Sequence, residues 1–334
     1  MSDYSFLERA LHRLALGFPL LAELSFDLER HFIKPVSEHH DAIYVTGLAR
    51  AGTTALMRGI HASGQFASLT YDDMPFVLAP NLWARLSKLH GKRRIWQERA
   101  HGDGIRIDFD SPEALEEVFW RLHSGGDAIH ARSLRIHTVD RQTVHALHDY
   151  QRLICHKYKR PRYLAKNNNH ILRIASLAGQ VKNTKFIILF RNPVAQARSL
   201  LQQHRRFQNT DPFTRSYMNW LSHHEFGATH KPLHFAEHVK TQGSFDHLDD
   251  WLRCWINAYR YLLGLFEQGV PNLIPACYET LCNDTDDWKT VCRLINIPLS
   301  NNPFNRSGHD RSRNQSPLIQ EANEIYNALR RIRR

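Results

Sequence analysis

Cysteine is scarce in this sequence, which has five cysteines in 334 residues, an odd number, and no Cys-x-x-Cys pair. Neither a disulfide framework nor a thiolate zinc site is therefore predicted. No apolar stretch approaches the roughly 18 residues of a transmembrane helix. Charged residues interrupt the apolar part of the amino-terminal segment, unlike the pattern of a secretory signal. We expect a soluble protein of a reducing compartment, the cytoplasm.

Acidic residues are also few, with 33 Asp and Glu against 44 Lys and Arg, which leaves a net charge of +11 beside 22 histidines. This balance favours an anionic partner such as a nucleotide, phosphate, sulfate, nucleic acid or acidic membrane surface. A hydrophobic content of 42% excludes a disordered chain. The absence of a Gly-x-Ser-x-Gly motif disfavours an α/β-hydrolase.

Short apolar segments alternate with helical patterns along the chain. Strands are predicted over residues 42–46, 66–70, 163–165, 185–190 and 272–277, and helices over residues 53–61, 170–179, 194–204, 247–266 and 286–295. Repeated strand–helix order is typical of a parallel sheet covered on both faces. The fold class predicted is α/β, a P-loop-like three-layer sandwich whose central sheet is mostly parallel.

We expect residues 1–334 to form a single domain. Its parts are N-terminal helices over 1–35, a core over 36–298 with polar, helical insertions at 83–160 and 205–245, and a C-terminal loop and helix over 299–334. The N-terminal helices either pack on the core or lie on a membrane surface, since an apolar face flanked by basic residues suits both.

The segment Gly47-Leu48-Ala49-Arg50-Ala51-Gly52-Thr53-Thr54 lies between a predicted strand and a predicted helix. Backbone N–H groups at such a turn, together with a helix N-terminus, form an anion-binding loop. The glycine spacing is that of the P-loop G-x4-G-K-[ST], but Thr53 stands in place of the lysine. The predicted binding residues of this loop are Arg50, Ala51, Gly52, Thr53 and Thr54.

A second cationic position follows the strand predicted over 185–190. Arg191 comes directly after it, and Ser199 lies eight residues later in the next helix. The carboxyl ends of strands are where open α/β sheets bind ligands. One cation and one hydroxyl there predict a second phosphate site, and two phosphate sites indicate a doubly phosphorylated nucleotide.

These segments resemble the PAPS-dependent sulfotransferases, where PAPS is 3′-phosphoadenosine 5′-phosphosulfate. GLARAGTT is similar to the family's P-[KR]-[SA]-G-T-T loop, with Ala49 in place of Pro, and FRNPVAQARS is similar to its R-[ND]-P-x5-S motif. Tyr278-Glu279-Thr280-Leu281 looks like the family's Y-E-[DE]-L. Lys166-Asn167-Asn168 looks like its K-[TND]-P, with Asn168 in place of Pro. The resemblance leans toward the bacterial and tyrosyl-protein branch.

The resemblance implies an enzyme that moves a sulfuryl group from PAPS to a hydroxyl acceptor, giving a sulfate ester and adenosine 3′,5′-bisphosphate without a metal. It assigns Arg50 and Lys166 as catalytic cations, although Lys166 is alternatively a surface lysine. Asp73 is the first candidate for the general base and Asp72 the second. The two acids could instead cap a helix over residues 75–82. Further candidates for the base are His101, His123 and His130.

Two rival functions remain at this stage. One is a P-loop kinase or another nucleotide-binding enzyme, and the other is a basic protein that binds nucleic acid or a membrane. In the favoured interpretation no nucleic acid is a partner. The acceptor is a lipid, sugar, peptide or small alcohol, and the Arg and His content of the insertions favours an anionic one. Arg306-Ser307-Gly308 either contacts the 3′-phosphate or belongs to a mobile loop without a role in binding. The sequence indicates no oligomeric state.

Overall fold

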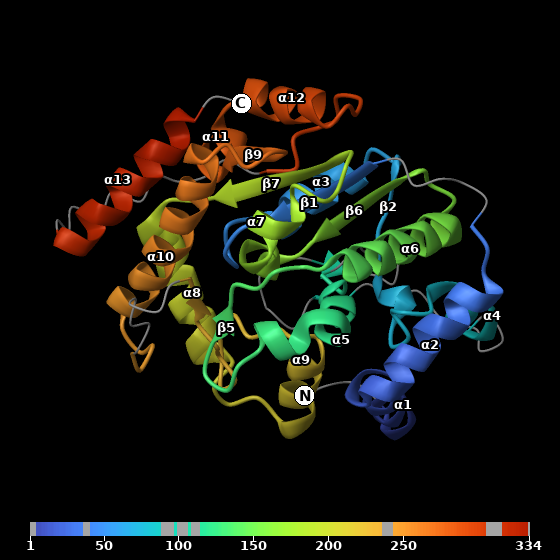
Figure 1. Ribbon diagram of the computed structural model, residues 1–334. Coiled ribbons are helices and arrows are strands. Elements are labelled where there is room, and N and C mark those ends of the chain that lie inside the picture. The colour runs from blue at the N-terminus through green and yellow to red at the C-terminus, as the bar shows by residue number, and fades with distance from the viewer. Residues whose placement is uncertain are drawn as a thin grey trace.

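The computed structural model describes residues 5–35, 41–87, 114–235, 243–304 and 316–332, together with the backbone of two short strands, β3 (Gln97–Glu98) and β4 (Arg106–Ile107). A five-stranded parallel sheet lies at the centre, in the order β2-β6-β1-β7-β9 (Figure 1). Its strands are β1 (Asp41–Thr46), β2 (Phe66–Ala67), β6 (Arg162–Lys166), β7 (Thr184–Phe190) and β9 (Leu273–Cys277).

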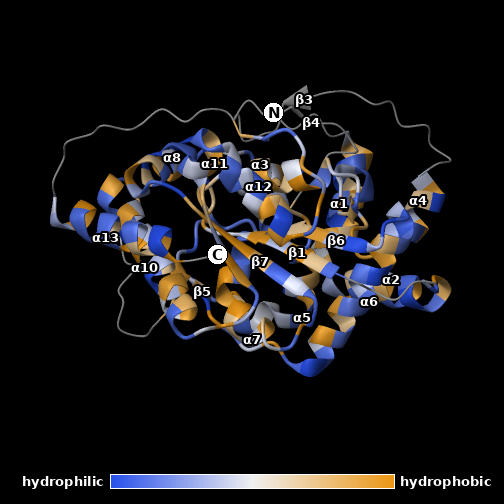
Figure 2. Cartoon of the chain, turned by 90° about the horizontal axis from the view of Figure 1, so that it is seen from above, coloured by the Kyte–Doolittle hydropathy of each residue, from blue (hydrophilic) through white to orange (hydrophobic). Residues whose placement is uncertain are grey.

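Alternate residues of each strand point to opposite faces of the sheet, as strand geometry requires. Ile43 and Val45 of β1 belong to a core cluster with residues of α3 (Thr53–His61) and α12 (Thr285–Leu294). Ala42 and Tyr44 belong to a second cluster, with residues of α6 (Arg141–Tyr158) and α10 (Leu248–Glu267). In Figure 2 the apolar strands β1, β6 and β7 lie between helices. The predicted three-layer α/β fold with a parallel sheet is confirmed.

Three of the helices pack against one another. Helix α8 (Pro193–Arg206) packs on α10, and α10 packs on α13 (Pro317–Arg331), which contacts β9. The helix expected over residues 170–179 is interrupted, with a 3₁₀ turn η3 (Asn168–Leu172) followed by α7 (Ile174–Leu177). The break occurs at Arg173, whose φ is −126°. The buried guanidinium of Arg173 pairs with Glu117 at 2.7 Å.

The second predicted strand is shorter than expected. It ends at Ala67, and Thr70 caps a 3₁₀ turn, η1 (Tyr71–Asp73). The helix predicted over residues 75–82 begins later, as α4 (Pro80–Ser87).

The two expected insertions contain α5 (Glu117–Ala128), α6 and α9 (Pro212–Trp220). Helix α6 covers one face of the sheet, because its Leu147, Tyr150 and Ile154 are buried in the core. The insertions also meet each other, since β5 (Leu134–Arg135) of the first pairs with β8 (Leu233–His234) of the second.

The N-terminal segment forms two helices, α1 (Phe6–Gly17) and α2 (Pro19–Phe32), as expected. Helix α1 packs on α9, and α2 packs on α4, α5 and α6 (Figure 1). Their outer surface is nevertheless apolar, with exposed Phe6, Leu7, Leu14, Phe18, Leu20, Leu21, Leu24, Leu28 and Phe32. The described part of the chain contains no membrane-spanning helix, since none of its helices combines the necessary length and hydropathy.

Candidate active site

The segment between β1 and α3 is a tight loop whose two glycines cannot be replaced without strain. Gly47 has φ +139°, and a Cβ there would lie 2.2 Å from the carbonyl oxygen of Leu189. Gly52 has φ +98°, and a Cβ there would lie 2.6 Å from the ring of Tyr278. Arg50 also has a left-handed backbone, with φ +70°. A left-handed non-glycine residue costs roughly 1–2 kcal/mol, and such strain is concentrated at functional loops.

Side chains from α8 and α10 fix the backbone of this loop. Gln196 Nε2 donates to the carbonyl oxygens of Leu48 and Ala49, at 3.1 and 3.0 Å. Gln196 in turn accepts from the indole of Trp255 at 3.0 Å. The hydroxyl of Tyr259 accepts from the Leu48 amide and donates to a β7 carbonyl. The loop is therefore preorganised. These supports could not be predicted from the sequence, where they appear only as polar groups within apolar helix faces.

Helix α3 begins at Thr53, at the end of the loop. The first N–H groups of any helix lack partners within the helix, and its N-terminus carries a partial positive charge. With Arg50 in the preceding turn, the predicted residues Arg50 to Thr54 form one electropositive segment suited to an anion.

The two arginines predicted to bind phosphate, Arg50 and Arg191, lie at the same loop. Nη1 of Arg191 donates to the Arg50 carbonyl oxygen at 3.4 Å, and the Arg191 guanidinium lies 4.6 Å from the centre of the Tyr278 ring. Nε of Arg191 is buried and has no hydrogen-bond partner among the described residues. Ser199 accepts from Nε of Arg50 at 3.1 Å, so its hydroxyl contacts Arg50 in the structure, whereas the sequence had grouped it with Arg191.

The Tyr-Glu-Thr-Leu segment supports this arrangement from α11 (Tyr278–Asn283). Besides the contact of Tyr278 with Arg191, the carboxylate of Glu279 accepts from the Asn192 amide at 2.9 Å. Its other oxygen accepts from the hydroxyl of Tyr326 in α13, also at 2.9 Å. Glu279 thus ties the turn that carries Arg191 to the C-terminal helix.

Lys166 is the last residue of β6 and pairs with Val45 of β1. Its exposed fraction is 8%, so the alternative of a surface lysine is wrong. The following residue, Asn167, donates from its amide to the Val45 carbonyl at 3.0 Å and from its side chain to Glu117 at 2.6 Å. Lys166 therefore lies at the end of β6 beside Val45 of β1. Val45 is two residues before Gly47, where the anion-binding loop begins.

Asp73 is completely buried and fully engaged. Its carboxylate accepts from Lys157 Nζ at 2.5 Å, from the Tyr158 hydroxyl at 2.7 Å and from the Thr70 amide at 2.7 Å. Burial raises the pKa of Asp73, although Lys157 opposes the shift. Asp72 is more exposed and lies 3.5 Å from Lys157. The capping interpretation is thus supported for Asp73, at η1 rather than at a helix over 75–82, and its role as base stays a prediction.

The histidine candidates for the base are placed on α5 and just after it. His123 stacks on Phe119 at 4.1 Å, and burial lowers its pKa. His130 contacts the Asp127 carbonyl oxygen at 3.1 Å. His101 and the Arg306-Ser307-Gly308 segment lie outside the described residues.

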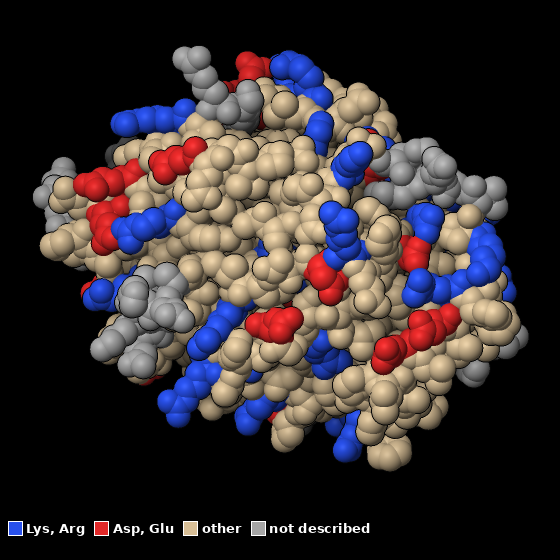
Figure 3. All heavy atoms as spheres, viewed as in Figure 1, with Lys and Arg blue, Asp and Glu red and all other residues tan. Residues whose placement is uncertain are grey.

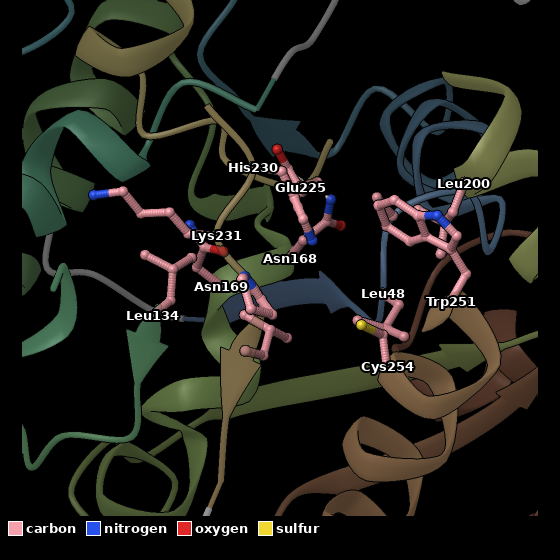
Figure 4. A pocket seen from close by; sticks show the side chains of 13 residues that line it. Leu48, Leu134, Asn168, Asn169, Leu200, Glu225, His230, Lys231, Trp251 and Cys254 are labelled. Atoms are coloured by element: carbon pink, nitrogen blue, oxygen red, sulfur yellow. Dashed lines mark hydrogen bonds between the residues drawn. The ribbon is translucent and has the colours of Figure 1, made fainter. Parts of the chain in front are cut away.

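A pocket opens beside the anion-binding loop, with Leu48 and Ala49 in its wall (Figure 4). Its polar lining residues are Asn168, Asn169, Glu225, His230 and Lys231. Glu225 was not among the predicted site residues. Its segment is polar and without periodicity, so the sequence offered no reason to select it.

Metal coordination was not expected, and within the described ranges no three His, Cys, Asp or Glu side chains are grouped as a metal site.

Comparison with curated proteins gives no match. Among solved structures, the chain is similar to the sulfotransferase STF1 from Mycobacterium tuberculosis, with 16% identity, a TM-score of 0.49, and coverage of 90% of this chain and 80% of that one. It is also similar to the sulfotransferase STF9 from Mycobacterium avium, with 14% identity, a TM-score of 0.45, and coverage of 91% and 76%. A sulfotransferase from Alicyclobacillus acidocaldarius shows 12% identity, a TM-score of 0.42, and coverage of 87% and 94%.

A family model described as the sulfotransferase family matches residues 42–300, which begin in β1 and include the loop, Lys166, Arg191 and the Tyr-Glu-Thr-Leu segment. Since this match covers well over half of the chain, the protein belongs to the sulfotransferase family.

Proposed function

We propose that this sulfotransferase uses PAPS as donor and a hydroxyl compound as acceptor, releasing a sulfate ester and adenosine 3′,5′-bisphosphate. The observation that carries the proposal is the convergence of two guanidinium groups on one loop, since Arg191 contacts the backbone of Arg50. Two cations at a preorganised anion loop suit a ligand with two separate phosphates better than one with a single phosphate.

The residues present fit such a donor. The 5′ end would bind the loop of residues 47–54, where the glycines leave room for close approach and α3 presents its N-terminus. The 3′-phosphate would bind Arg191, whose buried Nε lacks a partner among the described residues. PAPS, when bound, supplies an activated sulfuryl group and an adenosine bisphosphate leaving group.

Catalysis in this arrangement is mainly positioning and preorganised charge. Negative charge develops on the leaving 5′-phosphate during transfer, and cations fixed beforehand stabilise it without reorganisation. Arg50 and Lys166 would take this role, which is supported by the contact of Arg50 with Ser199 and by the position of Lys166 at the end of β6. A third group must remove the proton of the acceptor hydroxyl.

The rival functions account for fewer of these features. A P-loop kinase uses a lysine at the position of Thr53 to contact the β- and γ-phosphates. Nucleic-acid binding favours a continuous basic surface. On the face shown in Figure 3, acidic and basic side chains are interspersed.

Calorimetry on the full chain tests the proposed donor. We expect adenosine 3′,5′-bisphosphate to bind at least tenfold more tightly than adenosine 5′-monophosphate, because one charged contact contributes about 1.5–3 kcal/mol. Binding should need no magnesium, and PAPS labelled with ³⁵S should then donate its sulfuryl group to an acceptor. Equal affinity for the two nucleotides, or tighter binding of magnesium-ATP, would contradict the proposal.

We also propose that the enzyme contacts membranes peripherally through α1 and α2. Phe6, Leu7 and Leu14 of α1 are exposed, and so are Leu20, Leu24 and Leu28 of α2, which follow one another at helical spacing. Exposed Arg9, Arg13, Arg30 and Lys34 flank these residues. An exposed apolar stripe bordered by basic side chains is the pattern of an interfacial helix.

A further inference from the structure

We propose that Glu225 is the general base of the reaction, and that its pocket binds an uncharged, largely apolar alcohol or phenol. This inference rests on the proposed function, because it concerns the acceptor side of the same site. It begins from the position of the pocket, whose wall includes Leu48 and Ala49 of the anion-binding loop (Figure 4). An acceptor in this pocket would lie next to the loop proposed to hold the sulfuryl donor.

A short chain of hydrogen bonds ties the Glu225 carboxylate to the carboxyl end of β1. Nδ2 of Asn168 donates to Oε1 of Glu225 at 3.1 Å. The carbonyl oxygen of Asn168 accepts from the hydroxyl of Thr46 at 3.4 Å. Thr46 ends β1 and immediately precedes Gly47. Two hydrogen bonds therefore connect Glu225 to Thr46, the residue directly before the anion-binding loop.

The charge state of Glu225 suits a base. Burial opposes ionisation, but His223, Lys166 and the Asn168 hydrogen bond prevail and lower the pKa of Glu225 below its ordinary value. The carboxylate is therefore ionised at neutral pH. Asn168 is its only side-chain hydrogen-bond donor among the described residues.

Asp73 differs in this respect, because three donors occupy its two oxygens and its exposed fraction is zero. A base needs an oxygen that an acceptor hydroxyl can reach. Glu225 is partly exposed and lines the pocket, whereas Asp73 would first have to give up existing partners.

The rest of the lining indicates the kind of acceptor. One side of the pocket carries Leu48, Leu200, Trp251 and Cys254, opposite the polar groups (Figure 4). Lys231 also lines the pocket, but its ammonium donates to the His130 carbonyl oxygen at 2.8 Å. The ionised Glu225 would repel an acceptor carrying a carboxylate or sulfate. An uncharged acceptor follows, in contrast to the anionic one that the composition of the insertions favoured.

Two buried polar atoms in the wall lack partners among the described residues, Oδ1 of Asn168 and Nε2 of His230. Burial lowers the pKa of His230 to about 4, so its ring is neutral at neutral pH. Because Nδ1 of His230 donates to the His224 carbonyl oxygen, Nε2 of the neutral ring is an acceptor, as is the Asn168 amide oxygen, and both can accept from donor groups of the bound molecule other than the hydroxyl proton that Glu225 takes. The pocket therefore combines an apolar side for the body of the bound molecule with polar groups for its hydrogen-bond donors.

The proposed step is balanced. Glu225 takes the proton of the acceptor hydroxyl as the acceptor oxygen forms its bond to sulfur. The bond between sulfur and the bridging phosphate oxygen breaks, and its electron pair stays on the phosphate of adenosine 3′,5′-bisphosphate. Arg50 and Lys166 stabilise that charge, and the proton on Glu225 passes to solvent.

The test compares Glu225→Gln with wild type, using PAPS as donor and 2-naphthol as the acceptor probe. The amide keeps the shape of the side chain and can still accept from Asn168, but it is not a base. We expect kcat to fall about 100- to 1,000-fold, within the usual range for loss of a general base. Affinity for adenosine 3′,5′-bisphosphate should stay within about threefold, since the side-chain hydrogen bond of Glu225 is to Asn168 and not to a residue of the anion-binding loop. Glu267→Gln, an exposed acid at the end of α10, is the matched control and should retain full activity.

Two further measurements separate a base from a structural residue. The wild-type rate should fall at acidic pH as Glu225 becomes protonated, and Glu225→Asp should recover part of the activity that Glu225→Gln loses. The anionic probe 6-hydroxy-2-naphthoate should react with a kcat/KM at least tenfold lower than that of 2-naphthol.

Full turnover by a folded Glu225→Gln enzyme would overturn the assignment of the base, as would a loss confined to Asp72→Asn or Asp73→Asn measured in parallel. Preference for the anionic probe, or failure to sulfate 2-naphthol while adenosine 3′,5′-bisphosphate binds, would overturn the acceptor class. Failure of wild type to bind that nucleotide would instead contradict the proposed function itself.

Discussion

Nε of Arg50 lies 3.1 Å from the hydroxyl oxygen of Ser199, a residue 149 positions away in the sequence. The contact joins the anion-binding loop to the second turn of α8 and holds the guanidinium in one place. A cation that is already oriented stabilises an anion without the cost of ordering a long, flexible side chain. Ser199 is thus a positioning residue for Arg50.

Substitution of Ser199 tests this role. We expect Ser199→Ala to weaken binding of adenosine 3′,5′-bisphosphate by about 1 kcal/mol, the usual net value of one hydrogen bond. A double-mutant cycle by calorimetry should give a coupling energy of about 0.5–1.5 kcal/mol between Ser199→Ala and Arg50→Ala. A larger coupling with Arg191→Ala would instead support the original grouping of Ser199 with the second phosphate.

Arg191 is expected to determine recognition of the 3′-phosphate. Arg191→Ala should weaken binding of adenosine 3′,5′-bisphosphate by about 1.5–3 kcal/mol, while affinity for adenosine 5′-monophosphate changes little. Arg191→Lys keeps the charge but not the planar group that stacks on Tyr278, so we expect an intermediate loss. Unchanged calorimetric affinity of Arg191→Ala for the bisphosphate would remove the second phosphate site.

The elements that could be predicted from the sequence are those whose signals are local. The run of apolar residues before Gly47 indicates a buried strand, and a glycine at each end of the next six residues indicates a tight turn, because only glycine tolerates those backbone angles beside other atoms. Arg191 was found for the same reason, since it directly follows a strongly apolar strand.

The remaining parts of the site depend on contacts between distant segments. Gln196 and Tyr259 support the loop from 147 and 211 residues away, and nothing in their neighbours announces this role. Glu225 contacts Asn168 near the end of β6. It lies shortly before β8, which pairs with β5, and these strands of two residues each are too short to give a periodic pattern in the sequence. Adjacent Asp72 and Asp73 look equivalent in sequence, and burial and hydrogen bonding in the folded protein distinguish them.

Asp73 and Asp72 should therefore differ in their effect on stability. Asp73→Asn leaves Lys157, whose side chain is only 10% exposed, without its closest counter-charge, so we expect a loss of about 3 kcal/mol in the free energy of unfolding. Asp72→Asn removes a longer and more exposed contact and should cost less than about 1 kcal/mol. Urea denaturation measures both values. A fully stable Asp73→Asn enzyme that binds nucleotide but lacks turnover would restore Asp73 as the base.

The exposed face of α1 and α2 predicts binding to vesicles. We expect the protein to co-sediment with vesicles that contain phosphatidylserine, and Leu20→Glu with Leu24→Glu to lower the affinity at least tenfold, since burial of one leucine contributes about 1.5–3 kcal/mol. Glu23→Gln, between the two leucines, is the control and should bind normally. The same sedimentation for the double variant and wild type would show that this face does not contact the membrane.

His230 should make stability depend on pH. Its ring lies 4.5 Å from that of Phe245 and 4.8 Å from that of Trp251, and one ring nitrogen contacts the His224 carbonyl oxygen at 3.0 Å. Burial is the main cause that lowers its pKa to about 4, with His204 acting in the same direction and Glu225 opposing it. The unfolded chain, with an ordinary pKa of about 6.5, therefore takes up a proton at a higher pH than the folded protein does.

The stabilisation that follows is present above about pH 6.5 and is lost as the pH falls toward the folded pKa of about 4. His230→Gln keeps a polar side chain but removes this titration. Urea unfolding at pH 7.5 and at pH 5 should then show that wild type loses about 1–2 kcal/mol more than the variant between the two conditions. Other buried histidines titrate in both proteins, so the difference between them isolates His230. Equal losses would mean that its imidazole takes up a proton as readily in the folded protein as in the unfolded chain, and the neutral hydrogen-bonding group assigned to the pocket would be lost with it.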